Sequence, residues 1–89
     1  MEMIDLLNAR WVREPLWRQS TWWREKAMIN GYVFYVYRET LNDGRPVFDV
    51  EVHIVNTRYG LVANVATRAE ARQFAVNFDV EAFKREMRA

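Results

Sequence analysis

His53 is the one histidine of the 89-residue chain, and the carboxylates Asp49 and Glu51 precede it at alternate positions. Because alternate residues of a β-strand share a face, these three side chains are expected on one side of a strand. An imidazole beside carboxylates is suited to general acid–base work. However, no nucleophile with an orienting partner accompanies His53, and Ser20 lacks the strand–turn–helix context of a hydrolase nucleophile. The sequence therefore predicts no catalytic residue and favours a binding protein over an enzyme.

The sequence contains no cysteine and only three glycines. Disulfides and thiolate metal sites are therefore excluded, and no zinc spacing, calcium loop or phosphate-cradling glycine loop is present. We expect no metal and no cofactor. The lack of cysteine fits a reducing compartment. No stretch approaches the roughly eighteen apolar residues of a membrane span, and no signal-peptide pattern is visible. We therefore expect an intracellular, cytoplasmic protein that does not contact membrane.

The charges of the chain are balanced and evenly spread. The net charge is +1, and residues 1–31, 32–66 and 67–89 carry five, three and five basic side chains against four acidic ones each. A dedicated nucleic-acid binder is expected to carry a strongly basic field. The balance therefore favours another protein as the partner.

Aromatic side chains lie among these charges. In a strand over 32–37, Tyr35 and Tyr37 would point to the same face as Asp49, Glu51 and His53. Such a face is too aromatic for an ordinary hydrated sheet and too charged for a core, which is typical of a recognition surface. Two interpretations stay open. Either the N-terminal segment folds over the tyrosines, or the tyrosines contact a second protein, which can be another copy of this chain.

Trp22 is the other candidate anchor for a partner. On a helix predicted from residue 15 to about residue 28, it falls in the polar arc between Arg18 and Lys26. Either one of these cations lies over the indole, or Trp22 is exposed for recognition, because Trp and Arg are enriched at interface hot spots. The predicted protein-interaction residues are therefore Trp22, Tyr35, Tyr37 and His53.

The elements that must position these residues begin with three predicted strands, over 32–37, 47–55 and 61–66, where β-branched and aromatic residues dominate. Asn42-Asp43-Gly44 predicts a hairpin loop between the first two strands, and a turn is expected at 56–60. Thr67 and Glu70 have capping-box spacing, so a helix is expected to start directly after the third strand. That helix is the nearest cover for the sheet. Its Phe74 and Phe78 are expected to face the apolar side of the second strand, which consists of Phe48, Val50, Val52 and Ile54.

Two helices are predicted in the N-terminal third of the chain. The first has one apolar stripe, formed by Met3, Ile4, Leu7 and Trp11. Pro15 interrupts it and suits the first position of the second helix, which runs to about Met28. The apolar arc of that second helix holds Leu16, Trp17, Ser20, Trp23 and Ala27.

A continuous C-terminal helix would carry two apolar stripes on nearly opposite sides. They are Ala71, Phe74, Ala75, Phe78 and Ala82, and Val76, Val80, Phe83 and Met87. A helix lying on one sheet needs only one stripe. Either the helix breaks at 77–79, with Asp79 capping a new turn, or it continues and the second stripe is covered by the N-terminal helices. We favour the second interpretation, because those helices also have an apolar stripe to bury.

The segment PVFDVEVHIVNTRYGLVANVATRAEARQFAV, which starts at Pro46, resembles the C-terminal half of a double-stranded RNA-binding domain. The family has an F-x-V-E-V strand, a turn, a glycine-containing strand, and S/T-K-K-x-A-K at the start of its last helix. The matching residues are Phe48, Val50, Glu51 and Val52 in the strand, Tyr59-Gly60 at the turn, and Thr67, Ala71 and Ala75 in the helix. The resemblance covers about 32–78. It implies an α-β-β-β-α order and double-stranded or structured RNA as the ligand.

Departures from the family affect its RNA contacts. Three basic residues at the start of the family's last helix grip phosphates, and here those positions read Arg68, Ala69 and Arg72. The family's G-P-x-H loop is replaced by residues 42–46, in which Asp43 is negative. Losing phosphate contacts weakens electrostatic binding. Degenerate members of the family are generally protein-interaction domains, so the resemblance permits both functions.

We therefore expect one α+β domain over residues 1–89, with a helical segment at 1–30 and a β-β-β-α unit at 31–89. The predicted sheet has three antiparallel strands with helices packed on one face. The first predicted function is protein–protein recognition, as an adaptor, an inhibitor or a dimerising module. RNA binding is the alternative, through Arg58, Arg68 and Arg72.

Overall fold

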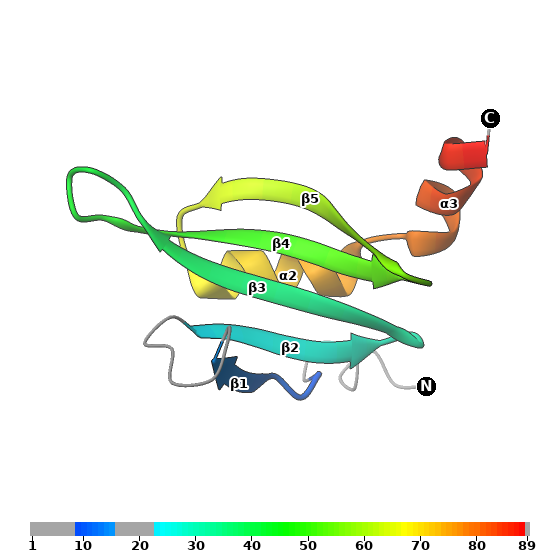
Figure 1. The fold of residues 1–89 in the computed structure, drawn as a ribbon, viewed down its shortest axis with the longest axis horizontal. Coiled ribbons are helices and arrows are strands. Elements are labelled where there is room, and N and C mark those ends of the chain that lie inside the picture. The colour runs from blue at the N-terminus through cyan, green and yellow to red at the C-terminus, as the bar shows by residue number, and fades with distance from the viewer. Residues whose placement is uncertain (1–8, 16–22, 89) are drawn as a thin grey trace.

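The computed structural model describes residues 9–15 and 23–88. Within them, five strands form one antiparallel sheet whose spatial order follows the chain, and two helices come after it (Figure 1). The strands and helices are β1 (Val12–Pro15), β2 (Trp23–Ile29), β3 (Tyr32–Thr40), β4 (Pro46–Ile54), β5 (Thr57–Val65), α2 (Arg68–Asn77) and α3 (Val80–Arg88).

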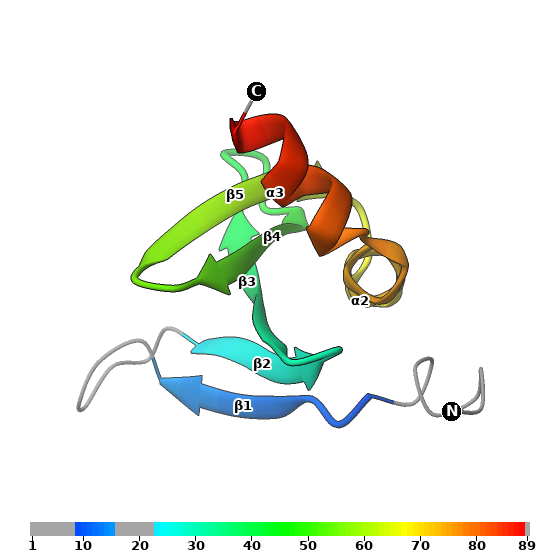
Figure 2. The same ribbon diagram turned by 90° about the vertical axis from the view of Figure 1, so that its right-hand side faces the viewer.

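Buried and more exposed residues alternate along β2, β3 and β4, which gives the sheet one apolar face. Helix α2 lies across this face (Figures 1 and 2). We call this the covered face. Its buried core consists of Ala27, Ile29, Phe34, Val36, Phe48, Val50, Val52 and Ile54 from the strands with Ala71, Ala75, Val76 and Val80 from the helices. Ala71 and Ala75 are fully buried, so the smallest side chains of α2 allow its backbone to approach the sheet closely. Phe74 and Phe78 are partly buried and pack against this core.

The three-stranded sheet predicted from the sequence is wrong, because β1 and β2 extend the sheet beyond β3. The predicted helix over 15–28 is wrong for its described part, since residues 23–29 are a strand. The apolar arc predicted for that helix included Trp23 and Ala27. These residues are four positions apart, and this spacing keeps two side chains on one face in a strand as well as in a helix. Glu25 and Ile29 complete the strand alternation.

The Asn30-Gly31 turn explains why β2 pairs with β3. Ile29 pairs with Tyr32, and Asn30 and Gly31 have φ angles of 53° and 86°. Asn-Gly is the dipeptide that favours the two-residue hairpin turn with positive φ at both positions. Pro15 ends β1, an edge strand, where a missing amide is tolerated. Most of the predicted first helix, and residues 16–22 of the second, lie outside the described residues.

The C-terminal helix breaks after Asn77, so the interpretation of a continuous helix covered by the N-terminal helices is wrong. Phe78 has an extended backbone conformation, with φ −73° and ψ 131°. Asp79 then caps α3, because its carboxylate accepts from the Ala82 amide at 3.0 Å. After the break, Val80 and Phe83 of the second stripe pack on the core, whereas Met87 is exposed. Phe83 contacts Phe78 and Tyr59 edge to face, with ring centroids 5.5 and 5.6 Å apart.

Several local predictions are confirmed. The strands predicted over 32–37, 47–55 and 61–66 correspond to β3, β4 and β5, although β3 is longer and β5 begins earlier. The hairpin loop contains Gly44 with φ 87°. Thr67 caps α2, since its hydroxyl oxygen accepts from the Glu70 amide at 3.1 Å.

Candidate functional site: the open face of the sheet

The face of the sheet opposite α2 is not covered by either described helix (Figure 2). We call it the open face. Strand pairing arranges its side chains in rows across the sheet. One row pairs Glu14 with Arg24, Arg24 with Tyr37, and Tyr37 with Asp49. The next row is Lys26, Tyr35 and Glu51. The third row pairs Val33 with His53, and His53 with Arg58.

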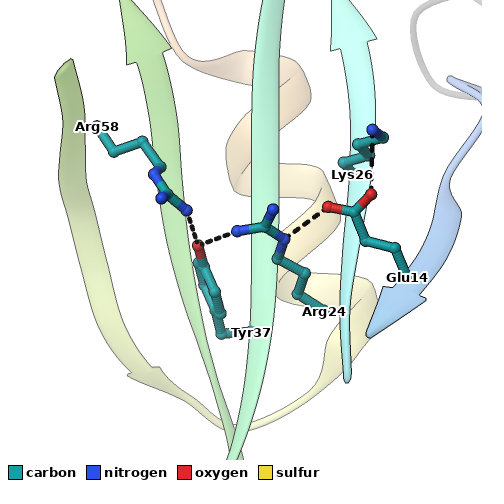
Figure 3. A network of polar contacts seen from close by, with 5 residues as sticks. All are labelled: Glu14, Arg24, Lys26, Tyr37 and Arg58. Atoms are coloured by element: carbon teal, nitrogen blue, oxygen red, sulfur yellow. Dashed lines mark hydrogen bonds and ion pairs between the residues drawn. The ribbon is translucent and has the colours of Figure 1, made fainter. Parts of the chain in front are cut away.

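The Tyr37 hydroxyl is the meeting point of two arginines on the open face (Figure 3). It accepts one hydrogen bond from Arg24 Nη1 and one from Arg58 Nη1, each 3.0 Å long. These arginines come from β2 and β5, on either side of the β3–β4 pair. Side chains from β2, β3 and β5 are therefore held together by one phenol.

Glu14 extends this network to β1 (Figure 3). Its carboxylate pairs with Arg24 Nε at 2.7 Å and with Lys26 Nζ at 3.0 Å. Partial burial acts to raise the pKa of Glu14, but the hydrogen bonds and charges of Lys26 and Arg24 outweigh that effect and hold the pKa below its ordinary value. Glu14 is therefore ionised at neutral pH and fixes the basic side chains of β2.

Guanidinium groups also cover the tyrosine rings. Arg24 Cζ lies 4.3 Å from the Tyr35 ring centroid, and Arg58 Cζ lies 5.6 Å from it. The Tyr35 and Tyr37 centroids are 6.2 Å apart. Stacking of this kind is stabilising and restricts the rotamers of both partners. Tyr35 and Tyr37 are half-buried, and the arginine contacts restrict their rotamers.

The β4 side of the open face is acidic. The negative charge of Asp49, together with partial burial, raises the pKa of Glu39 above its ordinary value. Asp49 also accepts a hydrogen bond from the Asn64 amide at 2.9 Å. Glu51 lies in the next row. His53 is half-buried, and its Nδ1 atom is buried without a hydrogen-bond partner among the described residues.

The structure places three of the four predicted interaction residues on the open face, namely Tyr35, Tyr37 and His53, while Trp22 lies outside the described residues. Strands β1 and β2 do not fold over the tyrosines, because they continue the sheet at its edge. The sequence interpretation missed Glu14, Arg24 and Lys26 as members of this face. The Asn30-Gly31 hairpin signal is what would have added β2 to the sheet and these residues to the surface.

The three arginines of the RNA alternative lie on opposite faces of the sheet and therefore do not form one surface. Arg58 belongs to the open face. Arg68 and Arg72 bind Glu25 on the covered face, with Arg68 Nε 3.0 Å from Glu25 Oε1 and Arg72 Nε 2.9 Å from Glu25 Oε2. Glu25 is 7% exposed. Two of the three arginines therefore neutralise a buried carboxylate.

Comparisons with protein-family models, curated proteins and solved structures gave no match. The resemblance to double-stranded RNA-binding domains therefore stays a prediction. No helix in the described part of the chain is long and apolar enough to cross a membrane. Among residues 9–15 and 23–88, no group of three or more His, Asp or Glu side chains is arranged to hold a metal ion.

Proposed function

We propose that this protein is a small dimerising module, in which the open face of the sheet recognises the open face of a second copy. The observation that carries the proposal is the order of charges across the face. Arg24 and Lys26 lie on β2, Tyr35 and Tyr37 lie on the central strand, and the carboxylates Asp49 and Glu51 lie on β4.

A two-fold axis parallel to β3 brings opposite charges together. Rotation about such an axis stacks two sheets face to face, with β3 over the partner's β3 and β2 over the partner's β4. Arg24 then faces the partner's Asp49, and Lys26 faces the partner's Glu51, because the rows keep their positions along the strand. A two-fold interface uses the same patch twice and must be self-complementary. The order of base, tyrosine and acid fulfils that requirement.

The side chains of β3, the central strand, also support a second copy of the chain as the partner. Tyrosine and arginine are enriched at interface cores and hot spots. Tyr35 and Tyr37 are already fixed by Arg24 and Arg58, so little side-chain entropy remains to be lost on association. Packing the open faces of two copies together also removes from water the part of the tyrosine surface that the arginines leave exposed.

RNA binding is less well supported by the geometry. Phosphate contacts require basic groups that are free to meet the backbone, whereas Arg68 and Arg72 are engaged by Glu25. Arg58 lies on the other face. A titration with duplex RNA at increasing salt tests this alternative. Binding that weakens steeply with increasing salt would establish phosphate contact. Absence of binding at low salt would rule out the RNA alternative.

The mass of the protein in solution tests the dimer. Sedimentation equilibrium of the parent chain is expected to give the mass of two chains, and Lys26→Glu or Glu51→Lys is expected to give the mass of one. Each substitution opposes like charges twice across the axis. Arg45→Glu in the hairpin loop, where the side chain is exposed, is the matched control and should leave the dimer intact. Circular dichroism verifies that each variant is folded. A monomeric parent at every concentration would contradict the proposal.

A further inference from the structure

A second feature lies on the covered face, beside the start of α2. It is a cavity of 280 Å³ at the end of the sheet where β2 begins and β3 ends. The residues that line it are Arg13, Trp23, Arg24, Glu25, Val36, Arg38, Phe48 and Arg68. Four strands and one helix therefore contribute to it, from segments up to 55 positions apart in the sequence.

The cavity has an excess of positive charge. Arg13, Arg24, Arg38 and Arg68 line it, and Arg72 lies next to it on Glu25. Glu25 is the only carboxylate among the described lining residues, and it is already bound by Arg68 and Arg72. Within residues 9–15 and 23–88, Arg13 and Arg38 have no carboxylate partner within ion-pair distance. Two guanidinium groups therefore remain for an anion from outside.

The wall of the cavity is aromatic. Trp23 is 46% exposed. This fraction is unusual because tryptophan side chains are mostly well buried in folded proteins. The Arg13 guanidinium lies 6.0 Å from its ring, and the Arg68 guanidinium lies 5.6 Å from the Phe48 ring. An indole and flat guanidinium groups are surfaces on which a planar ring stacks. The neighbouring arginines provide bidentate donors to phosphate.

We infer that this cavity binds a nucleotide, with the phosphate on Arg13 and Arg38 and the base against Trp23. Its volume is close to the lower limit of small-molecule sites, which suits one nucleotide and no more. That nucleotide can be free or can be one unit of a single strand. Apart from Arg24, the lining residues lie on the covered face, opposite the proposed dimer interface, so the inference does not rest on the proposed function.

Isothermal titration with adenosine monophosphate, inorganic phosphate, adenosine and a short single-stranded oligonucleotide tests this inference. The monophosphate is expected to bind more tightly than either phosphate or adenosine, because the arginines and the indole bind different parts of it. Tighter binding of the oligonucleotide with the same residue dependence would identify a strand as the source. Absence of binding by both the monophosphate and the oligonucleotide would overturn the inference.

Variants locate the site. Trp23→Leu is expected to weaken binding of the monophosphate about tenfold, the size of a lost base–aromatic stack, and Arg38→Gln is expected to weaken it to a similar degree. Arg45→Gln removes one exposed arginine elsewhere and should have no effect. Lys26→Glu should separate the dimer without changing nucleotide affinity. Equal binding by the parent and both cavity variants would overturn the assignment, provided that their unfolding transitions match that of the parent.

Discussion

Val55 has a φ of 58° in the two-residue turn between β4 and β5, and it is 84% exposed. A β-branched residue is strained there, by about 1–2 kcal/mol. Val55→Gly relieves the strain and loses little packing, although glycine adds entropy to the unfolded chain. We expect the free energy of unfolding in urea to rise by about 1 kcal/mol. Asn64→Gly is the control, since Asn64 has a φ of 59° but asparagine tolerates it. A Val55→Gly protein less stable than the parent would contradict this description of the turn.

Glu14 connects stability to acidity at the scale of one residue. Its pKa is lowered in the folded protein by Lys26 and Arg24, against the effect of burial. A lowered pKa gives stability that is present above the ordinary value of 4.5 and is lost as pH falls through the folded-state value. Glu14→Gln should therefore reduce stability by about 0.5–1 kcal/mol at pH 7. The stabilities of the parent and the variant should converge as the pH falls through the lowered pKa of Glu14 in the folded protein.

Thermal unfolding from pH 7 to pH 3 measures this difference. The raised pKa of Glu39 acts in the opposite direction, but it is common to both proteins and cancels in the comparison. A difference between the parent and the Glu14→Gln variant that stays constant with pH would show that the ion pairs of Glu14 are not the cause.

At the scale of elements, α2 is attached to the sheet by ion pairs as well as by apolar contact. Glu25 of β2 is buried, while the Arg68 and Arg72 side chains are 41% and 39% exposed. Arg68→Ala with Arg72→Ala leaves the buried carboxylate unpaired and should cost about 3–5 kcal/mol. Glu25→Gln alone should cost less, because its arginines reach water. Adding Glu25→Gln to the double variant should restore part of the lost free energy of unfolding, measured in urea. A double variant within about 1 kcal/mol of the parent would contradict this attachment.

The core makes a further prediction about the sheet and the helix. Phe34 is 1% exposed and lies edge to face with Phe78, at 6.4 Å. Phe34→Ala should cost about 3–5 kcal/mol in chemical unfolding, the usual range for such a cavity. Phe74→Ala should cost clearly less, since Phe74 is only partly buried and α2 contacts the sheet through Ala71 and Ala75. Equal losses would mean that Phe74 is as central as Phe34.

Much of β3 to α2 could be predicted from local signals. Alternation in 47–55 assigned Asp49, Glu51 and His53 to one face, and the Thr67–Glu70 spacing located the start of α2. The β2 strand could not be separated from a helix by its apolar spacing alone, because Trp23 and Ala27 fit both periods. The break at Phe78 depends on which stripe meets the sheet, and tertiary packing decides that.

The candidate site was predictable to a smaller extent. Tyr35 and Tyr37 follow from alternation, but their arginine partners depend on which strand lies beside β3. Arg24 is adjacent to Tyr37 only because the Asn30-Gly31 turn pairs β2 with β3. The cavity at Trp23 joins four strands to α2. Residues so distant in the sequence share no local pattern from which such a site could be recognised.

At the scale of the whole molecule, the two faces of the sheet have different charge patterns. The open face alternates basic, aromatic and acidic strands, whereas the covered face has surplus arginine beside α2. The first pattern suits a copy of itself, and the second suits an external anion. The two faces can therefore be tested separately with variants whose side chains lie on opposite faces of the sheet.

An equimolar mixture of the Lys26→Glu and Glu51→Lys proteins tests the central claim most directly. Each variant alone opposes like charges at both ends of the interface and should have the mass of one chain. In the mixture, Glu at position 26 of one chain meets Lys at position 51 of the other, and the second pair is native. Sedimentation equilibrium should therefore show the mass of two chains for the mixture only. A mixture that remains monomeric, while the parent is dimeric, would contradict the pairing of β2 with the partner's β4.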